Sequence, residues 1–195
     1  KNTSPKFIIL HYTAMFSSLE ALKYLSNPKN KVSSHFLVSK NGNIFNLVDV
    51  KFRAWHAGMS YWKKIKDINS NSIGIEIDNS GHLNKFENYR KEQIMSLIEL
   101  LKYLMKKFKI HPIDIIGHSD IAPYRKIDPG EKFPWRILYK NKLAFLPKKL
   151  SKSKSQSLEK YFLSKSLKGN KRKTIHMLKI IGYEVGPSLK VLFVD

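Results

Sequence analysis

The sequence predicts an α/β (or α+β) fold in which helices flank a central mixed β-sheet, with a short basic helical appendage after it. Three observations predict this: apolar runs rich in strand formers alternate with helix-like stretches, an Asn-Gly pair marks a hairpin, and the composition changes near residue 147. A chain of 195 residues is long enough for one well-buried domain. We therefore expect a globular domain over residues 1–147 and a basic linker with a helical tail over 148–195.

The first part of the chain predicts a strand, a helix and a hairpin. The run KFIILHY at residues 6–12 is apolar and rich in strand formers, so it predicts a strand with His11 near its end. A helix-like stretch follows around residues 18–25. Alternating segments at 34–39 and 43–48 flank the Asn-Gly pair, which predicts that they form an antiparallel hairpin.

The middle of the chain predicts a further strand and the longest helix. The segment SIGIEI at residues 72–77 predicts a strand, and Glu76 and Asp78, two residues apart, are expected to share a face. Over residues 91–108 apolar side chains recur at helical spacing, which predicts an amphipathic helix. The His-Pro pair at 111–112 breaks that helix.

The next segment predicts a buried strand followed by a restrained loop. The run IDIIG at residues 113–117 predicts a strand that delivers His118 at its end. The loop over 119–134 holds three prolines and one glycine, and Pro134 suits the start of a short helix.

The last part of the chain differs in composition. Lys and Ser dominate the residues just after 147, which predicts a solvated linker. Two short amphipathic pieces follow near residues 158–163 and 174–181, and then an apolar stretch at 191–194.

The chain is strongly basic, with a formal net charge of +21, of which the residues from Lys148 onward carry +9. The electrostatic field of so large a positive charge favours anionic partners, namely nucleic acid, anionic lipid or an acidic wall polymer. Lys greatly outnumbers Arg, and Asn and Ile are abundant, so a biased codon supply explains the charge equally well. No nucleic-acid recognition motif accompanies it, and we expect no specific nucleic-acid partner.

The remaining bulk features restrict the kind of site and the compartment. Cysteine is absent, so any metal must be held by histidine and carboxylate side chains. No apolar run approaches the roughly 20 residues of a membrane-spanning helix, so we expect no transmembrane segment. The chain begins at Lys1 rather than Met, and we expect that an upstream segment was removed.

Two of the seven histidines stand out by their positions. His11 and His118 each end a predicted apolar strand, and adjacent strand ends meet at one rim of a sheet. Asp128 lies in the restrained loop after His118 and can return to the same rim. Two histidines and one carboxylate leave a fourth position for water, which is the arrangement of catalytic zinc. Scattered His and Asp residues are common, so spacing alone leaves this open.

Five short blocks carry a more specific pattern. They are HYTA (11–14), VSSHFLV (32–38), WHAGMSYW (55–62), NSIGIEI (71–77) and GHSDIAPYRKIDPG (117–130). Together, in this order over about residues 6–140, they resemble the type 2 family of N-acetylmuramoyl-L-alanine amidases. One such block would be weak evidence, whereas five in register are a strong signal.

The resemblance implies one zinc ion per chain, held by His11, His118 and Asp128, with Glu76 and Lys126 as catalytic residues. Zinc would acidify a water molecule and polarise the scissile carbonyl. Glu76 would accept the water proton and pass it to the departing amine of L-alanine. Lys126 would place its ammonium group against the oxyanion of the tetrahedral intermediate.

Other interpretations of these residues remain open. Glu76 could be a strand carboxylate paired with one of the many Lys residues, and Asp78 is a rival base. Lys126 is singled out only by its place in the last block. Tyr124 stands where relatives often have Gly, so the geometry of that loop can differ from that of the family.

The same blocks imply a substrate groove with aromatic and amide side chains. Trp55 and Trp62 suit the core as well as a groove wall, and His35 suits an anchor between strands. Arg125 or nearby Lys residues could bind peptide carboxylates. The residues expected to contact substrate are His35, Trp55, His56, Ala57, Tyr61, Trp62, Asn79 and Arg125.

We therefore expect a zinc amidase that cuts the bond between N-acetylmuramic acid, or its 1,6-anhydro form, and L-alanine in peptidoglycan or muropeptides. The alternative is a non-catalytic peptidoglycan-binding module of the same fold, against which the three ligands argue. Residues 148–195 faintly resemble a small helical peptidoglycan-binding module, and a solvated basic tail fits them equally well. We expect a monomer in the periplasm or cell envelope, with the cytoplasm as the alternative, because blocks 11–14 and 55–62 look closer to envelope-located relatives.

Overall fold

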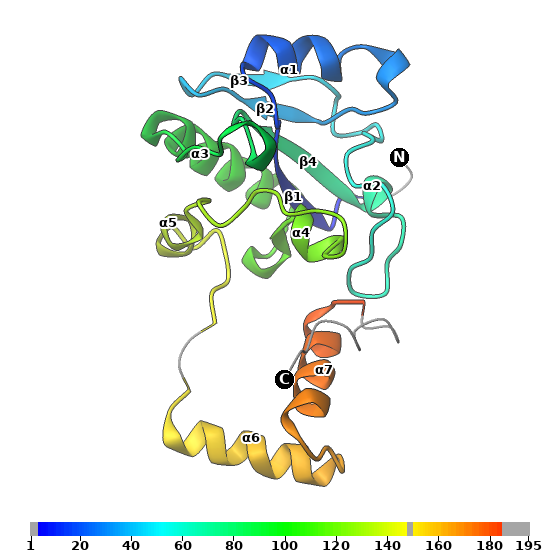
Figure 1. The fold of residues 1–195 in the computed structure, drawn as a ribbon, viewed down its shortest axis with the longest axis vertical. Coiled ribbons are helices and arrows are strands. Elements are labelled where there is room, and N and C mark those ends of the chain that lie inside the picture. The colour runs from blue at the N-terminus through cyan, green and yellow to red at the C-terminus, as the bar shows by residue number, and fades with distance from the viewer. Residues whose placement is uncertain (1–3, 148–149, 185–195) are drawn as a thin grey trace. The chain divides into compact units, whose positions relative to one another are not determined.

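The computed structural model describes residues 4–147 and 150–184, which form two compact units (Figure 1). The first unit contains the described residues up to Ser60 together with Lys66–Leu146. The second contains Tyr61–Ile65 together with the described residues from Pro147 onward.

A mixed five-stranded sheet forms the centre of the first unit, with the strand order β3-β2-β4-β1-β5. Strands β2, β4, β1 and β5 run parallel to one another, and β3 runs antiparallel to β2 at one edge. This arrangement confirms the expected fold class, and the hairpin predicted from the Asn-Gly pair is the β2-β3 pair. The strands are β1 (Phe7–Tyr12), β2 (Phe36–Val38), β3 (Ile44–Asn46), β4 (Ser72–Ile77) and β5 (Ile115–Gly117).

Helices flank this sheet, and the two that the sequence predicted at 18–25 and 91–108 have the expected bounds. The hydroxyl of Ser17 accepts a hydrogen bond from the backbone of Glu20 and so caps the first helix. The longest helix ends where Lys109 adopts a left-handed conformation, ahead of the His-Pro pair. The helices are α1 (Ser18–Leu25), α2 (Ile68–Asn71), α3 (Lys91–Phe108), α4 (His118–Ile121) and α5 (Trp135–Lys140), with 3-10 turns at Pro28–Asn30, His82–Asn84 and Pro112–Asp114.

One predicted boundary differs from the structure. Strand β5 begins at Ile115, two residues later than the run starting at residue 113 suggested. The reason is local, because Pro112–Asp114 forms a 3-10 turn in which the side chain of His111 accepts a hydrogen bond from the backbone of Ile113. The strand still delivers His118 immediately after Gly117.

Side chains alternate between the two faces of the sheet, and this separates the main apolar core from the polar residues of the candidate site. Leu10 and Ile75 belong to the larger apolar cluster, which the sheet forms with α3 and α5. Leu37 belongs to a separate cluster that includes buried residues of α1. Since successive residues of a strand point to opposite faces, His11 and Glu76 project from the face opposite Leu10 and Ile75. The candidate site therefore lies on the face of the sheet that α3 leaves uncovered.

The second unit holds two helices, α6 (Lys152–Ser164) and α7 (Asn170–Ile181). The expectation of a solvated linker is wrong from Lys152 onward, because the hydroxyl of Ser151 caps α6 and starts it well before the predicted amphipathic piece. Inside this unit Trp62 is buried and packs edge-on against Tyr183, with ring centroids 4.9 Å apart. The apolar stretch at 191–194 lies outside the described residues.

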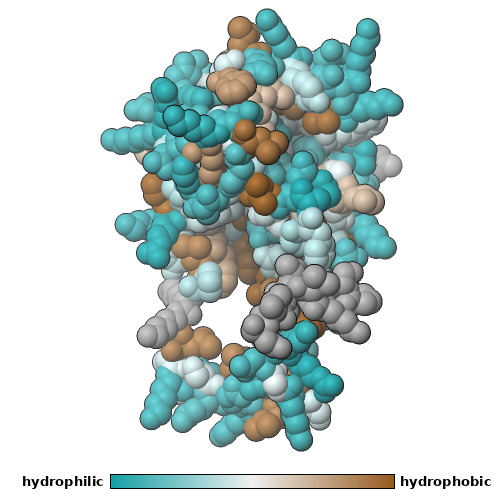
Figure 2. All heavy atoms as spheres, viewed as in Figure 1, coloured by the Kyte–Doolittle hydropathy of each residue, from teal (hydrophilic) through white to brown (hydrophobic). Residues whose placement is uncertain are grey.

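Hydrophilic side chains cover much of the visible surface of the molecule (Figure 2). On the face shown in Figure 2, hydrophilic side chains predominate and the hydrophobic ones are scattered in small groups. Among the helices of the described ranges, none combines the length and the apolar character needed to cross a bilayer.

Candidate metal centre

The parallel register of three strands brings the first site residues together at one rim. His11 on β1 lies opposite Glu76 on β4, and Leu10 lies opposite Gly117 on β5. His118 directly follows Gly117 and is the first residue of α4. Two imidazoles and one carboxylate that are distant in sequence thus come from three neighbouring strand ends.

The loop after α4 returns Asp128 to this rim. The backbone N–H of Ser119 donates to the carbonyl of Asp128 over 2.9 Å, and the hydroxyl of Tyr89 donates to the carbonyl of Pro129 over 2.7 Å. The peptide bond between Asp128 and Pro129 is cis. These contacts hold the carboxylate of Asp128 in a buried position, with 6% of the residue exposed.

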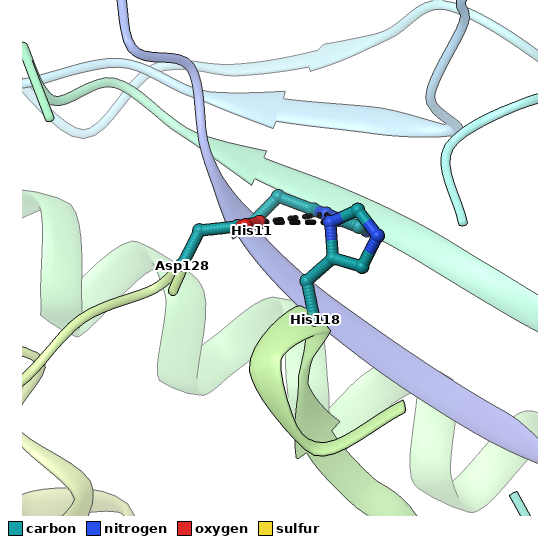
Figure 3. Close-up of side chains that lie close together, drawn as sticks. All are labelled: His11, His118 and Asp128. Carbon is teal, nitrogen blue, oxygen red and sulfur yellow. Dashed lines mark hydrogen bonds and ion pairs between the residues drawn. The ribbon is translucent and has the colours of Figure 1, made fainter. Parts of the chain in front are cut away.

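Three ligand-type atoms converge at the rim, as Figure 3 shows. The Nδ1 atoms of His11 and His118 are 2.9 Å apart. The Oδ2 atom of Asp128 lies 3.1 Å from Nδ1 of His11 and 3.0 Å from Nδ1 of His118. All three residues are buried, and together they form a group able to hold a metal ion.

Hydrogen bonds alone cannot account for all three contacts among these atoms. A carboxylate only accepts, so each imidazole could donate to Asp128, but two Nδ1–H groups would then face each other over 2.9 Å. A divalent cation accepts all three lone pairs at once. Zinc–ligand distances of about 2.0–2.2 Å place tetrahedral ligands about 3.3–3.6 Å apart, so small outward shifts of His11, His118 and Asp128 fit that ion.

The electrostatics of the group favour the forms that bind a cation. Burial, reinforced by the charge of His118, lowers the pKa of His11 from 6.5 to about 4. Burial opposes ionisation of Asp128, but the neighbouring imidazoles of His11 and His118 outweigh it and hold the pKa of Asp128 below its usual range. At neutral pH the site therefore presents a neutral His11 imidazole and an ionised carboxylate.

Glu76 lies in the same cavity, whose volume is about 410 Å³. Its carboxylate is buried, and Oε2 has no hydrogen-bond partner within the described residues. Burial and the charge of Asp128 raise the pKa of Glu76 well above 4.5, and the charge of Lys126 offsets this only in part. Lys126 also lines the cavity, which brings together the two residues expected to be catalytic.

Asp78 does not line this cavity, although it was a rival candidate for the base. Strand β4 ends at Ile77, and the backbone N–H of Asp78 donates to the carbonyl of Val38. The groups that influence its carboxylate include Lys40 and Ser18 rather than the metal-binding residues. The structure therefore separates Glu76 from Asp78.

Some of the expected substrate residues do reach the cavity or its extension. His56 and Arg125 line the main cavity. An adjoining pocket of about 470 Å³ shares His56, His118, Arg125 and Lys126 with it and adds the half-exposed Trp55. Two further cations, Lys31 and Arg53, line this second pocket and make it basic.

The other expected substrate residues line neither the main cavity nor the adjoining pocket. His35 is fully buried, where its Nδ1 accepts from the backbone of Gly74, so it anchors strands as the alternative interpretation held. Asn79 is buried and donates to the carbonyl of Glu87. Ala57 is fully buried as well. Tyr61 and Trp62 belong to the second unit.

Sequence reasoning missed the apolar wall of the main cavity. These residues come from separate loops and from α1, so no local pattern groups them, although Ala14, Val32 and Ile127 lie within the recognised blocks. The wall consists of Ala14, Met15, Ala21, Tyr24, Leu25, Val32, Leu83 and Ile127.

Comparison with known proteins supports the same assignment. Residues 1–131 match the family model described as N-acetylmuramoyl-L-alanine amidase. The N-acetylmuramoyl-L-alanine amidase AmiD of Escherichia coli is 40% identical over 147 residues, which are 68% of this chain and 51% of that protein. The chain spans about half the length of the curated relatives it matches.

Two solved structures have the same fold. The crystal structure of AmpDH3 from Pseudomonas aeruginosa matches with a TM-score of 0.80 and 29% identity, covering 100% of this chain and 78% of that one. The complex of AmiD from E. coli with the substrate anhydro-N-acetylmuramic acid-L-Ala-D-gamma-Glu-L-Lys matches with a TM-score of 0.77 and 30% identity, covering 96% and 75%. The sequence match and the fold agree with a buried group that could hold a metal, and the chain belongs to the type 2 N-acetylmuramoyl-L-alanine amidase family.

Proposed function

We propose that this chain is a zinc-dependent amidase that hydrolyses the bond between N-acetylmuramic acid, or its 1,6-anhydro form, and L-alanine in peptidoglycan or muropeptides. The observation that carries the proposal is the convergence of His11, His118 and Asp128 in a cavity that also holds the buried carboxylate of Glu76. Membership of the amidase family supports the identity of the bond that is cut, and the AmiD complex supports the class of substrate.

The metal in this proposal is one Zn²⁺ per chain, held by His11, His118 and Asp128. Two imidazoles and one carboxylate are a donor set that zinc takes in hydrolases, with one position left for water or substrate. When bound, zinc supplies Lewis acidity toward the scissile carbonyl and lowers the pKa of water to about 7.

Glu76 is the proton carrier in this mechanism. Its Oε2 atom has no partner within the described residues, so it is available to a water molecule in the cavity. Burial raises the pKa of Glu76, which makes its carboxylate a stronger base and favours its holding the proton that it accepts from water. The same carboxylic acid then delivers that proton to the amine of L-alanine, which leaves poorly without it.

Lys126 is the second catalytic group. It lines both the main cavity and the basic pocket, which supports a position of its ammonium near the scissile carbonyl. A fixed positive charge there stabilises the oxyanion that forms when water attacks the carbonyl carbon.

The two cavities match the two kinds of surface that a muropeptide offers. Trp55 and the apolar wall suit the faces of the sugar ring and the lactyl group. Arg125 and Lys126, with Lys31 and Arg53, suit the carboxylates of the stem peptide. Of the residues expected to contact substrate, we retain Trp55, His56 and Arg125.

We further propose that the second unit is a partial peptidoglycan-binding module and that the protein acts as a monomer in the cell envelope. The match to AmpDH3 extends over the whole chain, which supports a tail common to both proteins. Replacing Lys171 and Arg172 by Ala should weaken cosedimentation of the protein with sacculi. Unchanged cosedimentation at physiological salt would favour a plain basic tail instead.

Mass spectrometry of the products from intact sacculi and from anhydro-muropeptides tests the activity. We expect zinc-loaded protein to release L-alanyl peptides, and chelation, His118→Ala or Glu76→Gln to prevent this. Release that survives chelation and His118→Ala would refute the zinc mechanism. Tight binding of muropeptides without turnover in zinc-loaded protein would favour the non-catalytic alternative.

A further inference from the structure

We propose that His56 and Ala57 form a positioning element that fixes the proton of each metal-binding imidazole on Nε2, so that both Nδ1 lone pairs face the metal. The inference rests on the proposed zinc function and gives a new role to two residues that the sequence suggested as substrate contacts. His56 acts through its side chain on His11, and Ala57 acts through its carbonyl on His118.

The proton on His118 follows from a single contact. Its Nε2 atom lies 3.1 Å from the carbonyl oxygen of Ala57, which can only accept a hydrogen bond. Nε2 of His118 therefore carries the proton. In the neutral ring Nδ1 then has a lone pair, and Nδ1 is the atom that faces His11 and Asp128.

The proton on His11 follows from a chain of contacts that begins at another carbonyl. The hydroxyl of Ser72 donates its only proton to the carbonyl of Ile68 over 2.6 Å. Its oxygen can then only accept from Nε2 of His56, which lies 3.2 Å away. The remaining nitrogen of His56, Nδ1, accepts in turn from Nε2 of His11 over 3.0 Å. Nδ1 of His11 is thereby left as a lone pair at the metal centre.

The positioning element is itself held from two sides. The side-chain oxygen of Asn69 accepts the backbone N–H groups of both His56 (3.0 Å) and Ala57 (2.8 Å). The ring of His56 lies directly on strand β4, where a Cβ atom at Gly74 would come within 2.4 Å of its Cγ. This close approach explains a glycine in the middle of a strand that is otherwise rich in isoleucine.

The tautomer matters because zinc binds a lone pair and cannot bind an N–H group. Ligand histidines whose other nitrogen lacks its partner typically lose about 10- to 100-fold in metal affinity or activity. Ser72 belongs neither to the metal centre nor to the residues that line the cavity, and it should therefore influence zinc binding through His56.

Ser72→Ala tests the chain, with Ser34→Ala as the matched control. Both serines are fully buried, but Oγ of Ser34 has no hydrogen-bond partner within the described residues. Long-range ¹H–¹⁵N spectra of the zinc-free protein report the tautomers, and competition with a chromophoric chelator reports zinc affinity. We expect Ser72→Ala to populate the Nδ1–H form of His11 and to lower zinc affinity about 10-fold or more. Ser34→Ala should change neither reading.

A second pair of variants tests His56 directly. In His56→Asn the side-chain oxygen takes the place of Nδ1 and still accepts from His11, so most of the zinc affinity should be retained. His56→Leu offers no acceptor and should lose about 10- to 100-fold.

The outcomes separate this inference from the proposed function. Wild-type zinc affinity and an unchanged His11 tautomer in both Ser72→Ala and His56→Leu would overturn the positioning role. A wild-type protein that binds no zinc would instead overturn the proposed function. In that case the tautomers of the zinc-free protein still decide whether the hydrogen-bond chain exists.

Discussion

Replacing Glu76 by Gln should strongly slow catalysis and yet stabilise the zinc-free protein. Glu76 is 9% exposed, its Oε2 has no partner within the described residues, and the carboxylate of Asp128 raises its pKa further. A glutamine keeps the shape and removes the charge that burial penalises. Proton transfer by a placed side chain contributes about 10²- to 10⁴-fold to the rate, so kcat should fall by that factor.

The stability effect has a definite sign and pH range. Because the pKa of Glu76 is raised in the folded state, its contribution to stability is present below 4.5, the usual value, and is lost as pH rises through the folded pKa. The advantage of Glu76→Gln should thus be near zero at acidic pH and grow above it. Once Glu76 is ionised, each unit by which its folded pKa exceeds the unfolded value costs about 1.4 kcal/mol of stability, which corresponds to roughly 3–6 °C in Tm for a chain of this size.

Thermal unfolding of metal-free wild type and Glu76→Gln between acidic and alkaline pH measures this effect. Glu99→Gln is a suitable control, because Glu99 is exposed on α3 and should alter neither Tm nor kcat. Bound zinc should shrink the difference by stabilising the carboxylate. A Glu76→Gln protein that is less stable than wild type at alkaline pH, or that retains full activity, would refute the reasoning.

Three further predictions follow from the same geometry. Gly74→Ala should destabilise the protein by about 1–3 kcal/mol in urea unfolding, because the added Cβ atom clashes with the His56 ring. In a His56→Ala background the same substitution should cost clearly less, and additive effects of the two substitutions on stability would contradict this. As pH falls from 6.5 to about 4, the free energy of unfolding of the metal-free protein should fall by up to about 1.4 kcal/mol per pH unit, because His11 binds a proton in the unfolded state but not in the folded state. His11→Asn should flatten that slope. Lys126→Ala should lower kcat about 10²-fold and leave zinc affinity unchanged. If the substitution changed only zinc affinity, Lys126 would not be the residue that stabilises the oxyanion.

The parts of this molecule that follow from local patterns were predictable from the sequence. The Asn-Gly hairpin and the helix over residues 91–108 depend on turn chemistry and on apolar spacing, and both have the expected positions. His11 and His118 could be placed at one rim because each ends an apolar strand and the strands are neighbours. Bringing Asp128 back to that rim depended on the family blocks rather than on spacing.

Features that depend on long-range contacts were not predictable in this way. Asn69 and Ser72 look like ordinary polar residues around a short helix, and only the folded chain shows that they support His56. His35 and Trp62 lie in recognised blocks and were expected near substrate, but whether such side chains face a groove or the core depends on distant partners. The helix α6 extended into a Lys- and Ser-rich stretch because of a single capping serine.

Stoichiometric zinc titration of the metal-free protein, with bound zinc and release of L-alanyl peptide followed together, tests the zinc amidase most directly. We expect both signals to rise in parallel and to saturate at one equivalent of zinc per chain, and His118→Ala to give neither. Full activity before zinc is added, or saturated zinc binding at His11, His118 and Asp128 with no cleavage of the muramoyl-L-alanine bond, would contradict it.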